Sequence, residues 1–185
     1  MKLQGDRLYI RKTQVSDAEE LLAHHLRNKE LFDLYRPLRS EDDFTLEAMR
    51  GKLERQHQEW EQDKSYAFHV FLNETDAFIG SVDLMFVQRG PGQRALLGYE
   101  MDQAHHGKGL MSEAVRLCLK YGFEHAELHR IEAGVMPQNE GSNRLLEKLG
   151  FHKEGLFRKN VKINGQWEDH YIWAMLDTDW SNRSN

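Results

Sequence analysis

The sequence has little of what marks secreted, disulfide-stabilised or membrane-spanning proteins. Its 185 residues include three prolines and a single cysteine, Cys118. One cysteine excludes an internal disulfide framework and is typical of the reducing cytoplasm. No segment approaches the roughly 20 consecutive apolar residues of a membrane span, and residues 1–6 lack the apolar run of a secretory signal. These absences predict a cytoplasmic protein without membrane segments.

The chain also lacks a large excess of charge of one sign and the usual spacing of metal-binding histidines. The net charge of −5 argues against a broad nucleic-acid footprint, so we predict no direct nucleic-acid binding. The histidines include two adjacent pairs, His24 with His25 and His105 with His106. Neither pair has the four-residue spacing that directs two imidazoles of one helix toward a zinc ion. We therefore predict no metal site.

Hydrophobic patterning predicts one mixed α/β (α+β) domain over residues 1–185. Apolar residues alternate in some short runs and recur at helical spacing in others. Asn164 and Gly165 favour positive φ at two successive positions, which predicts a tight hairpin between the last two strands. The expected strands cover residues 6–12, 66–72, 78–84, 95–101, 130–135, 161–163 and 167–175. One helix is expected to begin near residue 17, and three more are expected over residues 41–63, 110–123 and 142–149.

Two glycines one residue apart, Gly107 and Gly109, lie between a predicted strand and a predicted helix. Glycine allows the backbone to approach a bulky anion, and the free amides and dipole of a helix start favour negative charge. The loop therefore suits a diphosphate, to which Lys108 could add positive charge. The third glycine of a dinucleotide fingerprint and the Gly-Lys-Ser/Thr ending of a P-loop are absent, which disfavours a nicotinamide or ATP enzyme. The spacing alone is equally compatible with a tight turn.

The second half of the chain resembles the GNAT acetyltransferases. The most specific combination is Asn139-x-x-Ser142 followed by Leu-Gly-Phe-x-x-Glu-Gly at residues 149–155. The tail is similar to the RimJ/RimL branch, the N-terminal acetyltransferases of ribosomal proteins, with RimJ the closer. The resemblance covers nearly the whole chain and is densest over residues 98–176. It implies a GNAT fold: a mixed, twisted sheet of about seven strands flanked by helices, split between its two central strands, with acetyl-CoA as co-substrate in the split.

The resemblance also implies which residues contact acetyl-CoA. Asn139 would offer its amide to pantetheine, although an asparagine at this point can equally cap the following helix. Ser142 matches the residue proposed to protonate the departing sulfur, and its alternative is an ordinary serine in the first turn of a helix. The implied acetyl-CoA contacts are Met101, His106, Gly107, Lys108, Gly109, Leu110, Met111, Asn139 and Ser142.

The general base is not carried over by the resemblance. The position of the glutamate given this role in RimL is Val161 here. Glu100, on the strand expected to line the split, is the candidate base, and its alternative is a surface carboxylate paired with a lysine or arginine. Asp169 and His170 are further candidates on the hairpin. Two aromatic side chains of these segments are expected to pack rather than react: Tyr99 and Trp167.

The expected activity is acetyl transfer from acetyl-CoA to an amine. The favoured acceptor is the N-terminal α-amine of a protein, above all a ribosomal protein with a small first residue. The alternatives are a small amine, such as a polyamine, an aminoglycoside or an aminoacyl-nucleotide toxin, and a module that binds acyl-CoA without turnover. A homodimer is compatible with the resemblance, and the sequence leaves the oligomeric state open.

Overall fold

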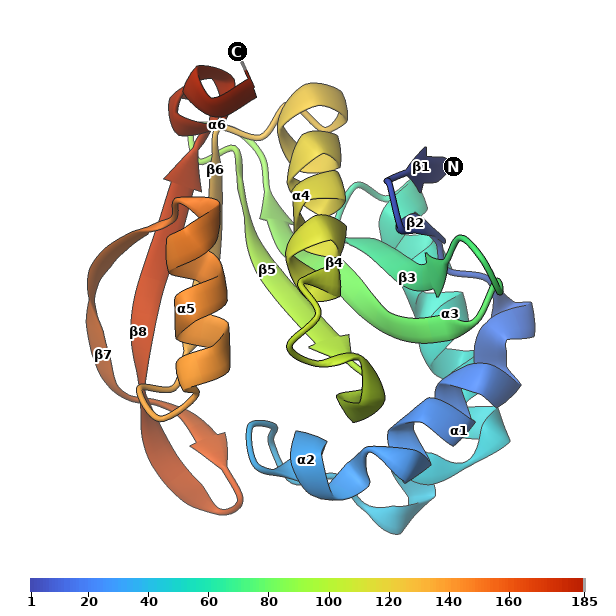
Figure 1. Ribbon diagram of the computed structural model, residues 1–185. Helices are drawn as coiled ribbons and strands as arrows, with labels where there is room; N and C mark the ends of the chain where they lie inside the picture. Colours follow the sequence, from blue (N-terminus) through green and yellow to red (C-terminus); the bar gives the residue numbers. More distant parts are fainter. Residues whose placement is uncertain (185) are drawn as a thin grey trace.

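The computed structural model describes residues 1–184, and these form an eight-stranded mixed sheet with helices on both faces (Figure 1). The strand order is β1-β2-β3-β4-β5-β6-β8-β7, and β5 and β6 are the parallel pair at its centre. The predicted α/β class is confirmed. The strands are β1 (Lys2–Gln4), β2 (Leu8–Lys12), β3 (Tyr66–Leu72), β4 (Phe78–Gln88), β5 (Arg94–Met101), β6 (Arg130–Val135), β7 (His152–Ile163) and β8 (Gln166–Leu176).

The helices divide between the two faces of the sheet. Helices α4 and α5 lie on the face toward the viewer in Figure 1, whereas α3 lies behind the sheet and packs against α1. A short helix, α2, follows α1 directly and lies below the open end of β5 and β6. The bounds are α1 (Ala18–Arg27), α2 (Lys29–Asp33), α3 (Leu46–Glu61), α4 (Leu110–Lys120), α5 (Glu140–Leu149) and α6 (Asp177–Ser184).

Helix α4 supplies the centre of the main core. Its buried residues recur at helical spacing and face the sheet: Leu110, Ala114, Val115, Cys118 and Leu119. Burial raises the pKa of the Cys118 thiol, as expected for a side chain that fills the core. A second, smaller core lies between α1, α3 and strands β2 to β4. In the part of the chain that the structure describes, no helix has the length and apolar character needed to cross a membrane.

Besides α2, which no sequence pattern predicted, three elements differ from the sequence-based expectation. Strand β1 has three residues, too few to show alternation, and it brings the strand count to eight. Strand β7 begins at His152, whereas the sequence predicted a start at residue 161. Its register shifts between Lys153 and Gly155 and again between Phe157 and Val161. Such shifts interrupt the alternation of side chains by which a strand is predicted. Helix α6 was not predicted. Residue 185, the last of the predicted domain, lies outside the described residues.

The predicted hairpin and the predicted split are both confirmed. Asn164 and Gly165 have φ values of 46° and 81°, as the tight turn requires. Strands β5 and β6 pair only over residues 94–96 and 130–132 and then separate. Beyond that point β5 stays paired with β4 and β6 stays paired with β8, so each strand keeps one partner while its inner edge faces the gap. The split therefore exposes main-chain groups of both strands.

Candidate active site

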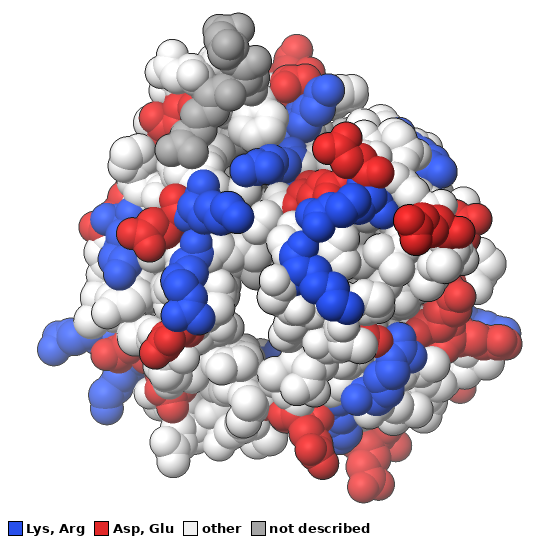
Figure 2. Space-filling model, viewed as in Figure 1, with Lys and Arg blue, Asp and Glu red and all other residues white. Residues whose placement is uncertain are grey.

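A cavity of about 850 Å³ occupies the split. The unpaired halves of β5 and β6 form its sides, the loop before α4 and the start of α5 form one wall, and α2 with the residues after it forms the opposite wall. Figure 2 shows lysine and arginine side chains along both rims of the hollow on this face. The cations that line the cavity itself are Arg36, Arg144 and Lys148.

The glycine loop presents backbone amides to this cavity. Gly107 and Gly109 both have φ of 73°, a conformation that favours glycine, and Gly109 is the N-cap of α4. A Cβ added at Gly107 would meet no atom within 4 Å, so the surface of the loop is open there. The first amides of α4, at Leu110 to Ser112, have no acceptor within the helix. This arrangement fits a diphosphate, which the helix dipole also attracts.

Side-chain hydrogen bonds hold the loop in place. His106 Nε2 lies 3.0 Å from the Met101 carbonyl oxygen and ties the loop to the end of β5. Lys108 Nζ donates to the Ala104 carbonyl at 2.9 Å, and Arg7 Nη1 donates to the Lys108 carbonyl at 2.8 Å. Lys108 therefore closes the turn with its ammonium, whereas the other eight predicted acetyl-CoA contacts line the cavity.

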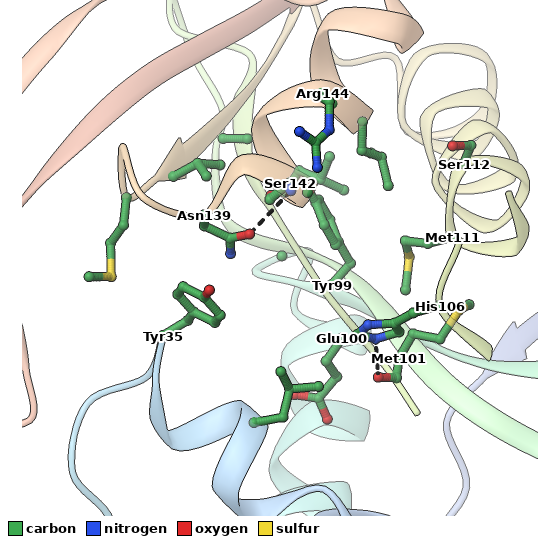
Figure 3. A pocket seen from close by; sticks show the side chains of 18 of the residues that line it. Tyr35, Tyr99, Glu100, Met101, His106, Met111, Ser112, Asn139, Ser142 and Arg144 are labelled. Carbon is green, nitrogen blue, oxygen red and sulfur yellow. Dashed lines mark hydrogen bonds between the residues drawn. The ribbon is translucent and has the colours of Figure 1, made fainter. Parts of the chain in front are cut away.

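Helix α5 brings Asn139 and Ser142 to the cavity. Asn139 caps the helix, because its Oδ1 accepts from the Ser142 amide at 3.2 Å. This cap leaves the amide nitrogen of Asn139 available, so the capping role and a ligand contact are compatible. The Ser142 hydroxyl lies 2.5 Å from the Tyr99 hydroxyl, and Figure 3 shows the Tyr99 ring directed toward α5. Tyr99 thus joins Ser142 in a pair of neutral hydroxyls at the cavity wall.

The surroundings of Tyr99 keep its phenol in the neutral form. Burial raises the pKa of Tyr99 to about 12, and the hydrogen bond with Ser142 only partly offsets this. The phenol is therefore protonated at neutral pH. Sequence reasoning expected Tyr99 to pack. Its polar contact could not be predicted, because it depends on a partner 43 residues away in the chain.

Glu100 points the opposite way from Tyr99, since neighbouring residues of a strand alternate between faces (Figure 3). Its carboxylate lines the cavity, forms an ion pair with Arg36 and lies 3.0 Å from His25 Nε2. Burial lowers the pKa of His25, so this imidazole is neutral and its Nε2–H donates to the carboxylate. The candidate base is therefore an ion-paired carboxylate, 16% exposed, at the edge of the cavity.

Of the remaining residues singled out in the sequence, one lies at the cavity and two lie away from it. His170 lines the cavity, and its Nδ1 lies 3.1 Å from the Glu168 carbonyl. Asp169 instead accepts from the Lys159 amide at 2.8 Å and supports the bulge of β7. Trp167 was expected to pack, but its position on the projecting hairpin leaves it 58% exposed.

Sequence analysis missed the α2 wall of the cavity. Leu31, Phe32, Tyr35 and Arg36 line it, yet α2 has only five residues and the following segment is irregular. Helical or strand periodicity cannot reveal such a segment. Within residues 1–184, no three His, Cys, Asp or Glu side chains are grouped so that they could hold a metal ion.

Comparison with known proteins identifies the class to which this fold and cavity belong. Residues 7–152 match the family model described as Acetyltransferase (GNAT) domain. The chain belongs to the GNAT acetyltransferases, as the sequence resemblance predicted, and it is an enzyme of the N-acetyltransferase type.

Individual relatives refine this result. YjcK of Bacillus subtilis (strain 168), described as a probable N-acetyltransferase, is 48% identical over 177 residues, which cover 96% of this chain and 98% of YjcK. The ribosomal-protein-S5-alanine acetyltransferase of Vibrio fischeri is 31% identical with a TM-score of 0.92, and the match covers 97% of this chain and 98% of that one. Mycobacterium smegmatis RimJ, solved with CoA-disulfide, is 22% identical with a TM-score of 0.87 over 96% of this chain and 89% of that one, a likeness of fold.

Proposed function

We propose that this protein transfers the acetyl group of acetyl-CoA to the N-terminal α-amine of a protein, with a ribosomal protein as the acceptor class. In this proposal residues 1–185 form one acetyltransferase domain that works in the cytoplasm. The observation that carries it is the cavity itself, which joins an amide-rich anion cradle on one wall to the carboxylate of Glu100 on the other. The similarity to a ribosomal-protein-S5-alanine acetyltransferase supports the acceptor class.

The α4 and α5 wall would hold acetyl-CoA, which supplies the acetyl thioester. The amides of the glycine loop and of the first turn of α4 would bind the diphosphate. Arg144 and Lys148, one helical turn apart on α5, line the same wall and add positive charge for phosphate groups. The inner edge of β5 and the amide of Asn139 would hydrogen-bond the pantetheine arm.

The hydroxyl pair would supply the proton that the departing thiolate needs. In this role Ser142 donates its proton to the sulfur and recovers one from Tyr99, at a distance of 2.5 Å between the two oxygens. The phenol then regains a proton from water. A phenol and an alcohol both stay protonated until the thiolate forms, which suits a general acid that acts late in the reaction.

Glu100 would accept the proton of the acceptor ammonium, directly or through a water molecule. An α-amine has a reference pKa near 8, so a carboxylate needs to remove only a modest excess of protonated amine. The ion pair with Arg36 holds the carboxylate of Glu100 at the cavity. Since Glu100 and Ser142 lie on opposite sides of β5, the acceptor and the thioester would approach the split from opposite faces.

A panel of acceptors tests this function. The protein is mixed with acetyl-CoA and either peptides that begin with Ala, Ser or Met or free amines such as spermidine and an aminoglycoside, and release of free thiol is followed. We expect turnover with the peptides, highest for small first residues. Turnover with free amines alone would favour a small-molecule acetyltransferase. Tight binding of acetyl-CoA without turnover would indicate a non-catalytic module.

A further inference from the structure

We propose that Arg36 determines acceptor specificity: its guanidinium would hydrogen-bond the carbonyl oxygen next to the reacting amine, so that the site selects α-aminoacyl acceptors over simple amines and polyamines. The inference rests on the proposed function, because it places the acceptor amine at Glu100. It adds a residue from the α2 segment that no motif of the chain marks.

The structure holds Arg36 firmly at the cavity. Its side chain is 17% exposed, lines the cavity and forms an ion pair with Glu100. The guanidinium carbon lies 4.1 Å from the centroid of the Phe32 ring, so the ring supports the face of the guanidinium. A guanidinium carries five N–H donors, more than one carboxylate can accept, and this leaves donors for a ligand.

Several elements fix this pair of charges. His25 of α1 holds Glu100 from behind, at 3.0 Å from Nε2 to Oε1. The end of α2 is tied to the β7–β8 hairpin, because Asn164 Nδ2 donates to the Asp33 carbonyl at 2.6 Å. Arg36, a hydrogen-bond donor, and Glu100, a hydrogen-bond acceptor, are therefore held side by side before the amine substrate binds. This lowers the entropic cost of orienting that substrate.

The chemistry of this pair matches an α-aminoacyl group. Such a group presents an ammonium donor and a carbonyl acceptor on neighbouring carbon atoms, which complement Glu100 and Arg36 respectively. A simple alkylamine satisfies only the carboxylate. A polyamine brings a second cation into a cavity where, among the described residues, the cations Arg36, Arg144 and Lys148 outnumber the single carboxylate, so repulsion counts against it.

The test compares acceptor preference in Arg36→Gln, Arg36→Lys and Arg39→Gln with that of the wild type. Arg39 lies exposed on the same segment and does not line the cavity, so its variant removes an equal charge without touching the pair. The acceptors are a short peptide that begins with alanine, isobutylamine and spermidine. Values of kcat and KM are measured by thiol release at saturating acetyl-CoA, and acetyl-CoA binding is measured by calorimetry as a check on folding.

We expect the wild type to prefer the peptide over both amines. In Arg36→Gln the KM for the peptide should rise, and the preference for the peptide over isobutylamine should fall about 10- to 100-fold, the range for losing a hydrogen bond from a charged group. Arg36→Lys should recover part of this preference, and Arg39→Gln should keep it within about twofold.

Four results would overturn the inference. An equal loss for peptide and isobutylamine in Arg36→Gln would show that Arg36 acts only through Glu100. A loss of preference in Arg39→Gln equal to that in Arg36→Gln would show a general charge effect. Wild-type turnover without preference for the peptide would overturn the role of Arg36 but leave acetyl transfer intact, whereas wild-type binding of acetyl-CoA without turnover of any amine would overturn the proposed function as well.

Discussion

The two walls of the cavity differ in the chemical groups that they present. The wall of α4 and α5 offers backbone amides, two glycines with positive φ and neutral hydroxyls. The opposite wall, formed by α2 and the residues after it, brings the charged side chain of Arg36 to Glu100 of β5, which also contacts His25 of α1. A site made of main-chain groups depends on local conformation, whereas a site made of paired charges depends on which distant residues meet.

The walls also differ in their spread along the chain. The first is supplied by one continuous strand-loop-helix-strand-helix segment, residues 98–148 without Glu100. The second combines residues from α1, α2 and β5, which are separated by up to 75 positions. We therefore expect substitutions in the first wall to affect the thioester, and substitutions in the second to affect the acceptor.

The largest effect should come from Gly107→Glu on the first wall. The new side chain would place bulk and negative charge where we propose that the diphosphate binds, and we expect acetyl-CoA affinity to fall more than about 100-fold by calorimetry. Gly90→Glu is a matched control, because Gly90 also has positive φ, 68°, and open space around its Cβ position. Unchanged affinity in Gly107→Glu would remove the cradle from the site.

Glu100→Gln should give the next largest effect, on the second wall. Loss of the carboxylate that we propose as the proton acceptor should lower kcat about 100-fold, the lower end of the range for general base catalysis. Acetyl-CoA affinity should stay within about twofold, because Glu100 faces away from the hydroxyl pair. A kcat within threefold of the wild type would assign the base to another group, with His170 the next to test.

Tyr99→Phe and Ser142→Ala should each lower kcat about 10-fold and change acetyl-CoA affinity less. Because the two hydroxyls would act as one proton donor, the double variant should lose little more than either single variant. Rapid-mix measurement of thiol release provides the rates. If the loss of kcat in the double variant equals the product of the two single losses, the hydroxyls act independently. An unaltered kcat in Ser142→Ala would show that Ser142 takes no part in the reaction.

The smallest effect concerns the free energy of unfolding of the protein at acid pH, to which His24, behind the second wall, contributes. Burial lowers the pKa of His24 to about 3, whereas in the unfolded chain it titrates near 6.5. The unfolded state therefore binds the extra proton first as pH falls, and the stabilising contribution, complete above pH 6.5, is lost toward pH 3. Between pH 7 and 5.5 this histidine alone should lower the free energy of unfolding by about 1 kcal/mol.

Urea denaturation at both pH values measures this decrease, and His24→Gln should make it smaller by that amount. The imidazole is fully buried and packs against the rings of Phe32 and Phe78, so only the difference between the two pH values is informative, not the absolute stability of the variant. An unchanged decrease in His24→Gln would show that another group carries the acid sensitivity.

Most of the fold followed from local patterns. Short strand-like runs located β2 to β6, and Asn164 with Gly165 located the final hairpin. The irregular strand β7 escaped because its bulges break the alternation, and β1 and α6 escaped because one is too short and the other has little apolar periodicity.

The glycine loop, Asn139 and Ser142 were recognisable from the sequence because each acts close to its neighbours in the chain. Gly109 caps the helix that follows it, and Asn139 caps the helix that contains Ser142. Even there, the sequence did not show that Lys108 turns its ammonium back onto Ala104. Side-chain direction in a loop depends on contacts that periodicity does not report.

By itself, the sequence determined the family, the order of the main elements and the position of the glycine loop, because these depend on residue patterns over short stretches of the chain. Only the tertiary structure decided the environment of Glu100 and Tyr99. One strand directs them to opposite faces, where residues from α1, α2 and α5 become their partners. The energy of a charge or a buried hydroxyl depends on what surrounds it in space, and that is known only once the chain is folded.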